Sequence, residues 1–281
     1  ESLSELNFAN GDTGNKFGFQ NDLMSAALGE KLEPWNILTG ENIAITTSGG
    51  ATEAGLNYST ISSYSGYDYI MGSASGGTAT YEFTAPSDGL SCLYFYTYPN
   101  KASISISHSS DGENFTHIST ESESLAFSRS VCDVKAGDII KVSVACAANK
   151  KNYLRIQCAI LDQKKMDYAL ERLSQSTLEL TTFKNTFIEG TVDCKQDGLL
   201  YTSIPQAGTN WHVYVDGKEE AVSLIGEAMV GVKLTKGTHT VNFRYENGAY
   251  ETGRIITLLS ILAFATLIGL HRYYKKKYPE A

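Results

Sequence analysis

IITLLSILAFATLIGL, residues 255–270, is an uncharged stretch that runs almost to the end of the chain. As an α-helix its sixteen residues would be about 24 Å long, slightly less than the roughly 30 Å hydrocarbon core of a bilayer. Flanking side chains can make up the difference, because arginines snorkel and tyrosines suit the headgroup level. We therefore predict a transmembrane helix over residues 254–274. The predicted anchor residues are Arg254, Ile255, Leu262, Leu270, Arg272, Lys275, Lys276 and Lys277.

The basic cluster HRYYKKK, residues 271–277, predicts the orientation of this helix. Lys and Arg accumulate on the cytoplasmic side, so the tail at 275–281 should be cytoplasmic and everything before residue 254 should lie outside the cytoplasm. The expected partner is the lipid bilayer. The competing interpretation, a buried core helix of a soluble protein, is disfavoured because the stretch has no polar face. Its hydroxyl groups, on Thr257, Ser260 and Thr266, can bond back to backbone carbonyls within a helix.

The other end of the chain offers no export signal, since it opens with ESLSE rather than with Met, a basic segment and an apolar segment. We expect either a signal peptide that has been removed or the C-terminal portion of a longer protein with upstream spans. A tail-anchored topology is disfavoured because three consecutive lysines would have to cross the membrane.

The charge distribution agrees with this division. Residues 254–281 hold five of the 23 Lys/Arg and one of the 31 Asp/Glu, which leaves a net charge of −12 on residues 1–253. Such a surface repels nucleic acid, so no nucleic-acid partner is expected. About 250 residues outside the membrane are enough for two modest cores.

The sequence before the membrane helix predicts an all-β protein. Residues 1–40 should form an N-terminal segment with one short helix, capped by Asn21 and ended by Gly29. Residues 41–161 alternate in polarity between turns rich in Gly, Ser and Asp, which is typical of an antiparallel sandwich. The clearest strands are residues 80–84, 93–97, 102–107 and 139–144.

Residues 162–175 predict a connecting helix, with Asp162 as its cap and an apolar face that packs against a sheet. Residues 176–250 predict a small membrane-proximal sandwich. Its strand at 198–205 should stop at Pro205, and Asp216-Gly217 should turn a hairpin. A second hairpin is expected over Lys236-Gly237. The predicted fold is thus two antiparallel, jelly-roll-like β-sandwiches joined by a short helix and followed by one transmembrane helix.

Catalytic and metal-binding patterns are missing from the sequence. The five histidines form no HxxxH or HxH pair, neither GxSxG nor a P-loop occurs, and the acidic pairs fall in solvated turns. We therefore predict no catalytic residue, no metal and no cofactor. The five cysteines also show no metal spacing, and we expect Cys132, Cys146 and Cys158 to be buried thiols, with one disulfide as the alternative.

Aromatic residues suggest a glycan contact. Sugar rings stack on aromatic faces while tyrosine hydroxyls bond sugar hydroxyls, although tyrosine is also a favoured strand residue. Tyr64, Tyr67 and Tyr69 lie in a stretch rich in Gly and Ser that we predict to be a loop, and Trp35 is the fourth candidate glycan-binding residue. Trp211 is expected in the core.

Three motifs near the end of the chain resemble the C-terminal part of the YfhO family of bacterial polytopic membrane proteins. They are DGLLYTSIP at 197–205, WHVYVDGK at 211–218 and KGTHTV at 236–241, with the membrane span behind them. FGFQNDL at 17–23 also resembles the short Gln-Asn segment after the family's last upstream spans.

This resemblance implies a GT-C type glycosyltransferase. Such enzymes move a sugar from a polyprenyl-phosphate donor onto a cell-envelope polymer such as lipoteichoic acid, and their catalytic acid lies in an early extracytoplasmic loop. No residue here matches that loop, so no catalytic residue is carried over. The chain would be the extracytoplasmic part of a bacterial membrane enzyme, which positions the acceptor or shapes the active cavity.

Two other classes remain open. One is a membrane-anchored, non-enzymatic glycan-binding module or adhesin, although no LPxTG-like sortase motif precedes the helix. The other is a structural spacer or assembly partner.

Overall fold

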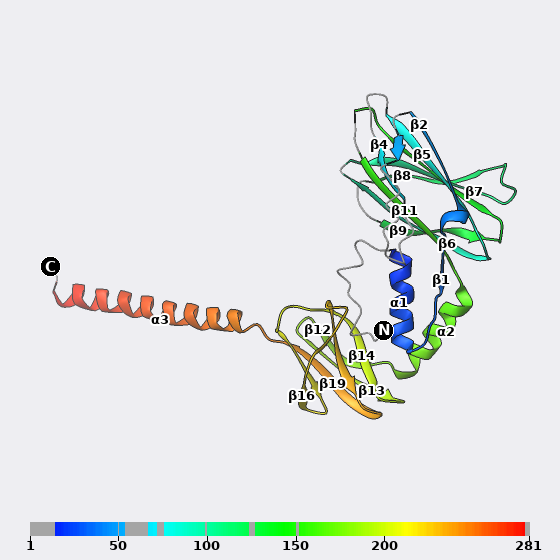
Figure 1. Ribbon diagram of the computed structural model, residues 1–281. Coiled ribbons are helices and arrows are strands. Elements are labelled where there is room, and N and C mark those ends of the chain that lie inside the picture. The colour runs from blue at the N-terminus through cyan, green and yellow to red at the C-terminus, as the bar shows by residue number, and fades with distance from the viewer. Residues whose placement is uncertain are drawn as a thin grey trace. The chain divides into compact units, whose positions relative to one another are not determined.

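The computed structural model describes residues 15–49, 51–53, 67–71, 76–98, 100–123, 127–149 and 152–278 (Figure 1). The chain divides into two compact units. The first comprises Glu1–Gln175 with Ile225–Glu227, and the second comprises Ser176–Leu224 with Ala228–Ala281. Each is described by itself.

The first unit is built on two antiparallel sheets with a shared core. One sheet has the order β3-β4-β11-β6-β9, with β1 also paired to β11, and the other has the order β2-β5-β10-β7-β8. The first contains β1 (Trp35–Ile37), β3 (Ala51–Glu53), β4 (Tyr67–Met71), β6 (Gly89–Tyr98), β9 (Phe127–Val134) and β11 (Asn152–Leu161). The second contains β2 (Ile43–Gly49), β5 (Gly77–Thr84), β7 (Ala102–Ser109), β8 (Thr116–Glu123) and β10 (Ile139–Cys146), and a short 3-10 turn (Gly40–Asn42) precedes β2.

The alternation of polarity explains why these strands pack as a sandwich. In β5, Ala79, Tyr81 and Phe83 are buried, while Thr80 and Glu82 face the other side of the sheet. The same pattern in β6, β7, β10 and β11 points Phe95, Ile104, Val142, Ile156 and their neighbours into one cluster. The four strands predicted most clearly from the sequence lie within β5, β6, β7 and β10, so the all-β sandwich fold is confirmed.

Helix α1 (Lys16–Leu28) begins five residues before its predicted cap. The side chain of Asn15 accepts hydrogen bonds from the backbone N–H groups of Phe17 and Gly18, both at 3.0 Å, and Gly29 ends the helix in the left-handed conformation at φ 70°. Gly29 as the stop is confirmed, but Asn21 as the cap is wrong. Asn21 lies within α1 and is buried, and its side-chain amide hydrogen-bonds to the backbone of Trp35 in β1.

Helix α2 (Gln163–Leu173) follows β11, and its predicted cap is confirmed. Asp162 Oδ1 accepts from Lys165 N at 3.2 Å. The prediction that this helix packs on a sheet is wrong, because α2 contacts α1 and the Tyr168 hydroxyl donates to Glu30 at 2.7 Å. Only Ala169 of the predicted apolar face is fully buried, and Leu170 stays half exposed. A 3-10 turn (Ser174–Ser176) ends the segment.

The second unit contains a smaller pair of sheets, with the orders β12-β13-β19-β15-β16 and β14-β18-β17. Val192, Val213, Val232 and Phe243 are at the centre of its core. The strands are β12 (Glu179–Lys184), β13 (Phe187–Cys194), β14 (Gly198–Pro205), β15 (Trp211–Val215), β16 (Lys218–Glu220), β17 (Ser223–Ile225), β18 (Met229–Leu234) and β19 (Gly237–Tyr245).

One predicted hairpin of this unit is confirmed and the other is wrong. β15 pairs with β16 across Asp216 and Gly217, which have φ values of 52° and 82°, as a tight hairpin turn requires. β18 and β19 are joined by Thr235 and Lys236 but belong to different sheets, since β18 pairs with β14 and β19 with β13 and β15. The apolar residues of both strands enter one core from opposite sides, so the short connection crosses between the layers.

Helix α3 (Gly248–Lys277) ends the described chain. Asn247 caps it by accepting from Tyr250 N at 3.1 Å, so the helix begins six residues before Arg254. Its N-cap lies two residues after the last residue of β19.

Candidate functional site

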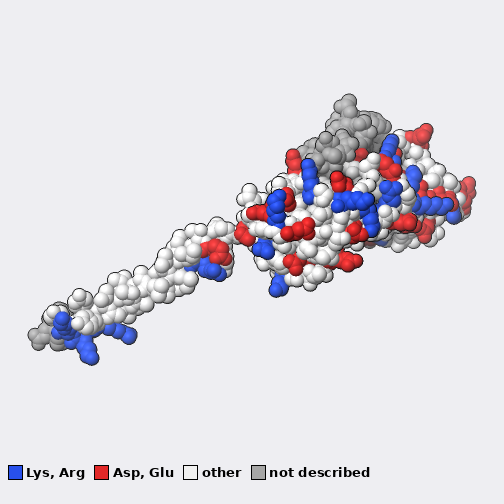
Figure 2. All heavy atoms as spheres, turned by 90° about the horizontal axis from the view of Figure 1, so that it is seen from below, with Lys and Arg blue, Asp and Glu red and all other residues white. Residues whose placement is uncertain are grey.

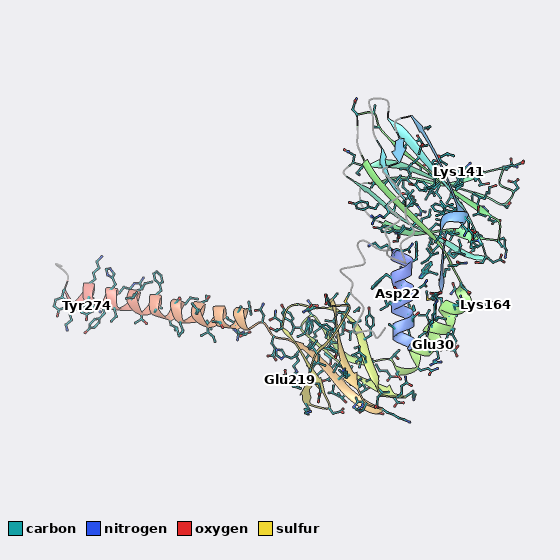
Figure 3. The ribbon with its side chains drawn as sticks, viewed as in Figure 1. Asp22, Glu30, Lys141, Lys164, Glu219 and Tyr274 are labelled. Atoms are coloured by element: carbon teal, nitrogen blue, oxygen red, sulfur yellow. The ribbon has the colours of Figure 1, made fainter. Side chains whose placement is uncertain are left out.

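The predicted membrane anchor lies entirely within α3. The helix has an 18-residue window of mean hydropathy 2.0 and no buried residue, so it does not form the core of a soluble fold. Its surface is uncharged along the middle, and Lys/Arg gather at the C-terminal end (Figure 2). Lys275, Lys276 and Lys277 occupy the last turn, and Tyr274 lies close to them (Figure 3).

The hydroxyl groups of the anchor are satisfied within the helix, as the sequence predicts. Thr257, Ser260 and Thr266 each donate to the backbone carbonyl four residues earlier, at 2.8 Å. No hydroxyl of these three therefore has to be transferred into hydrocarbon without a partner. At the other end, Arg254 pairs with Glu251 at 2.9 Å, one turn before the apolar residues begin.

Trp35, one of the candidate glycan residues, is held by α1 in a structural contact. Its ring centroid lies 5.0 Å from that of Phe17, and it packs with Cys92, Tyr94 and Ala159 on the outer side of the first sheet. Its indole Nε1 is buried and has no hydrogen-bond partner. Trp35 as a whole is half buried, and its role in glycan contact stays a prediction.

The amide of Asn21 fixes the backbone of Trp35. Asn21 Oδ1 accepts from Trp35 N at 2.9 Å, and Asn21 Nδ2 donates to Trp35 O at 2.8 Å. β1 bonds to β11 through the flanking residues, with Asp162 N donating to Pro34 O and Leu38 N donating to Cys158 O. The edge of β1 that faces away from β11 therefore receives its hydrogen bonds from a helix side chain. In the sequence, the only signal for this role of Asn21 is the Gln-Asn segment in which it lies.

The three candidate tyrosines lie differently from the prediction. Tyr67 and Tyr69 belong to strand β4, where they pair with Ile156 and Leu154, so their placement in a loop is wrong. A run of Gly and Ser around them hid a strand that is specified by pairing with β11 rather than by local pattern. Tyr64 lies outside the described residues.

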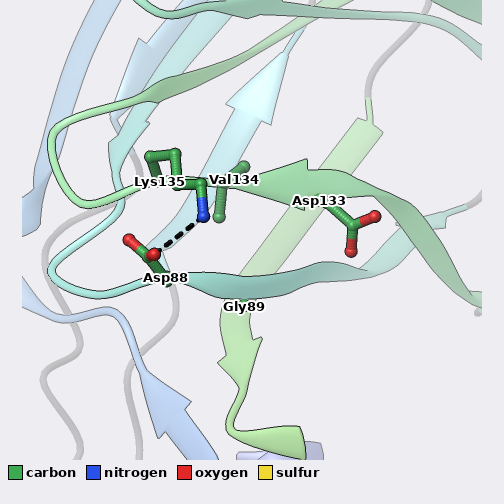
Figure 4. A pocket seen from close by; sticks show the side chains of 5 residues that line it. All are labelled: Asp88, Gly89, Asp133, Val134 and Lys135. Atoms are coloured by element: carbon green, nitrogen blue, oxygen red, sulfur yellow. Dashed lines mark hydrogen bonds and ion pairs between the residues drawn. The ribbon is translucent and has the colours of Figure 1, made fainter.

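A pocket of about 360 Å³ opens at one end of the first sandwich (Figure 4). It is lined by Asp88, Gly89, Asp133, Val134 and Lys135. Asp88 accepts from Lys135 Nζ at 2.9 Å and from Ala136 N at 3.0 Å, and both bonds lower the pKa of Asp88. The bond to Asp88 raises the pKa of Lys135. Both charged groups are thus used to tie two turns together, and neither is left as a free acid or base.

Three of the five histidines pair with carboxylates. His108 bonds Asp138 at 2.8 Å, His212 bonds Glu219 at 2.7 Å (Glu219 in Figure 3), and His239 bonds Asp216 at 2.7 Å. Within the described ranges no group of three or more His, Cys, Asp or Glu is placed to hold a metal ion.

The Asp216–His239 pair explains two of the motifs. His239 Nδ1 faces Asp216 Oδ2, and His239 Nε2 lies 3.0 Å from the carbonyl of Thr235. Carboxylates and carbonyls only accept, so the geometry favours the doubly protonated ring, and the Asp216 bond raises the pKa of His239. Asp216 Oδ1 also accepts from Thr240 N at 2.9 Å. In the first motif, Asp197 accepts from Lys236 N at 2.7 Å. These polar residues hold the turns of the small sandwich in place.

The cysteines of the described chain are free thiols where their side chains are placed. Cys92 and Cys158 are buried, whereas Cys132 and Cys194 are half buried. Burial raises the pKa of Cys92 to about 11 and that of Cys158 well above its usual value. The expectation of a buried thiol is confirmed for Cys158, and the side chain of Cys146 lies outside the described residues.

Comparisons with known proteins were made for sequence, family and structure. Comparison with curated protein sequences finds no match. Three similar solved structures are TmCBM61 in complex with β-1,4-galactotriose, a family 29 carbohydrate binding module and the family 11 module from Clostridium thermocellum. Their identities are 14%, 14% and 13%, and their TM-scores are 0.26, 0.29 and 0.30. The matches cover 45%, 46% and 45% of this chain and 88%, 86% and 95% of the other chains. At this level of similarity they carry no argument about a ligand.

The family model described as bacterial membrane protein YfhO matches residues 15–257. This range includes the N-cap Asn15, helix α1, both sandwiches and the start of α3, so the resemblance seen in the three motifs is confirmed. The chain belongs to the YfhO family of bacterial membrane proteins.

Proposed function

We propose that this chain is the extracytoplasmic region of a membrane glycosyltransferase that uses a polyprenyl-phosphate sugar donor to glycosylate a lipoteichoic-acid-like envelope polymer. The observation that carries the proposal is the family match, which spans both sandwiches and enters the membrane helix. Among the residues that the structure describes, no group of three or more His, Cys, Asp or Glu is placed to hold a metal ion, and the sequence predicts no catalytic residue in this chain. The sandwiches would accordingly position the acceptor or shape the cavity, and the chemistry would belong to the rest of the parent protein.

The orientation is part of this proposal. Three lysines in the last turn of α3 favour a cytoplasmic tail, so both sandwiches would lie on the outer side, where an envelope polymer is available. A membrane-impermeant maleimide applied to intact cells should label a Lys195→Cys variant, whose side chain is exposed, but not a Lys276→Cys variant. The unsubstituted chain measures background labelling from the native thiols. Labelling of the tail in intact cells would contradict the orientation.

The glycosyltransferase itself is tested by deleting the gene and measuring the sugar content of the envelope polymers. We expect the glycosyl substituents of one anionic polymer to disappear and to return with the wild-type gene. Unchanged sugar content in every envelope polymer would refute the proposal.

The second candidate is a non-enzymatic glycan-binding module, in which Tyr64, Tyr67 and Tyr69 contact oligosaccharide. This candidate rests on the run of tyrosines in the sequence, of which Tyr67 and Tyr69 lie on β4, a strand paired with both β3 and β11 in the first sheet. Tyr64→Ala and Tyr67→Ala should then weaken binding to teichoic-type polymers or oligosaccharides and leave thermal stability unchanged. Unchanged binding would remove this candidate, whatever the outcome of the gene deletion.

A further inference from the structure

One end of the small sandwich gathers aromatic and basic side chains from three separate segments. Hydrogen bonds bring the segments together there. Tyr245 N donates to Thr186 O at 2.9 Å, Glu246 N donates to Asn210 O at 2.8 Å, and Asn210 Nδ2 donates to the Tyr245 hydroxyl at 3.3 Å. We call this surface the aromatic end; it comprises Phe183, Lys184, Phe187, Trp211, Arg244 and Tyr245.

The aromatic end contains apolar surface that the fold leaves in water. Phe183 pairs with Ile188, which packs against the core, yet Phe183 is 73% exposed. Tyr250, on the first turn of α3, is 66% exposed. Exposed aromatic rings of this size usually mark an interaction surface when they lie close together.

Arg244 gives the same surface a positive charge that is held in place. Its guanidinium carbon lies 4.6 Å from the ring centroid of Tyr214 and 5.6 Å from that of Phe187. The side chain is exposed, and none of the described carboxylates forms an ion pair with it. An arginine held by rings and not neutralised by a carboxylate is suited to bind phosphate oxygens. Lys184, also exposed, adds a second positive charge.

The short connection between the aromatic end and the membrane helix determines how far the aromatic end can lie from the bilayer. Only Glu246 and Asn247 separate β19 from α3, and both are held by backbone hydrogen bonds. Residues 248–254 add about 10 Å of helix before the apolar stretch. Because that stretch is about 6 Å shorter than the hydrocarbon core, each end should be drawn inward by about 3 Å. Gly248 then lies about 7 Å outside the hydrocarbon, at the outer limit of the headgroup layer.

We propose that the aromatic end rests on the lipid headgroups of the leaflet that α3 enters. The rings of Phe183 and Phe187 enter the interface, and Arg244 and Lys184 bind lipid phosphates. The partner is the bilayer that already surrounds α3, so the surface continues an interface that the family and the helix establish. This contact requires only that α3 is inserted, and it holds for either orientation of the chain and with or without glycosyl transfer.

A depth measurement on the full chain in phospholipid nanodiscs tests the contact. In a Trp35→Phe, Trp211→Phe background, Phe183→Trp gives one fluorescent probe at the aromatic end. Gln196→Trp gives a matched probe at an exposed turn beyond the far end of β13, a strand about 25 Å long. Headgroup-linked nitroxide lipids should quench the first probe strongly and the second hardly at all. Equal, weak quenching of both would overturn the proposal, including the case in which another protein segment covers the aromatic end.

The phosphate contact has its own variant. Arg244→Gln combined with Lys184→Gln should lower the equilibrium constant between the docked and undocked sandwich by about fivefold per charge, measured as loss of quenching at the Phe183→Trp probe. Lys195→Gln, which removes a charge at the opposite end of the same sandwich, should leave the quenching unchanged. Quenching that survives the double variant at low and high salt would show that no phosphate is bound and would overturn this part of the proposal.

Discussion

Replacing Asn21 by alanine should loosen the attachment of β1 to α1. The carboxamide of Asn21 is 5% exposed and makes two hydrogen bonds to the backbone of Trp35, at 2.8 and 2.9 Å. Alanine leaves one N–H and one C=O without their partner. Each buried group left unsatisfied costs about 1–3 kcal/mol, so the two groups together would cost about 2–6 kcal/mol. Since Trp35 is only half buried, we expect the lower half of this summed range, about 2–4 kcal/mol. This is a large fraction of the 5–15 kcal/mol that stabilises a typical domain.

The assay uses the fact that the chain has two tryptophans, one in each unit. In a Trp211→Phe background the fluorescence of Trp35 reports the unfolding of the first unit alone. Urea unfolding of the full chain in detergent then gives the free energy of unfolding from the midpoint and slope. Asn36→Ala is the matched control, because Asn36 is exposed and its amide reaches only Ser87, at 3.4 Å. The control should change the free energy by less than about 0.5 kcal/mol.

A same-size variant separates the hydrogen bonds from packing. Asn21→Asp keeps the volume and one acceptor but points a carboxylate at the carbonyl of Trp35, so it should be at least as destabilising as alanine at neutral pH. Stability should partly return when the pH falls low enough to protonate the new carboxyl group, which can then donate. If Asn21→Ala falls within the range of Asn36→Ala, the assigned role of the amide is wrong.

Two further predictions concern turns and close contacts. The pKa of His239 is raised by its bond to Asp216, whose own pKa is lowered by the same bond. The contribution of His239 to stability is fully present below its unfolded pKa of about 6.5, and it is lost as the pH rises through the higher pKa of the folded state. The contribution of Asp216 is lost only at low pH, as the pH falls through the lowered pKa of its folded state. The unfolding midpoint of the second unit, followed by Trp211 in a Trp35→Phe background, should therefore fall above about pH 6.5 in the wild type but not in His239→Gln; parallel pH profiles would contradict this. Gly89→Ala would place a Cβ 2.3 Å from the carbonyl oxygen of Leu161, so it should lower the free energy of unfolding of the first unit by more than about 2 kcal/mol. Gly198→Ala is the control: a Cβ there meets open space, so the free energy of unfolding of the second unit should change by less than about 1 kcal/mol. Equal effects of the two glycine substitutions in thermal unfolding would contradict the steric reasoning.

Local patterns predicted the elements whose cause is local. Asp162 and Gly29 act within one helical turn, and Asp216-Gly217 makes a two-residue turn, so the chemistry of each is contained in its own neighbours. The back-bonded hydroxyls of the membrane helix belong to the same class, since their acceptors lie four residues away. The errors share the opposite property. The sequence predicts Asn21 as a cap because its true partner, Trp35, becomes adjacent only when α1 folds against β1.

The candidate site shows the same division. Tyr67 and Tyr69 lie in a strand because β11 pairs with them from more than eighty residues away, and nothing in the local composition indicates this. The connection of β18 to β19 reads as a hairpin, yet each strand has a partner from another part of the chain. The sequence does not predict the aromatic end either, because Phe183, Trp211 and Arg244 come from three segments that only the pairing of β12, β13, β19 and β15 brings to one end.

The sequence by itself determined that this protein is built from antiparallel strands, that its final helix suits a bilayer, and which family it belongs to. Hydrophobic periodicity, an uncharged run and motif spacing are properties of consecutive residues, so they can be read without coordinates. Only the tertiary structure decided which strands share a sheet, that α2 contacts α1, and that aromatic and basic side chains meet beside the start of α3. These features depend on contacts between segments that are distant in the sequence. Each strand could pair with many others, and the pairing that forms is the one that buries the apolar side chains in one common core.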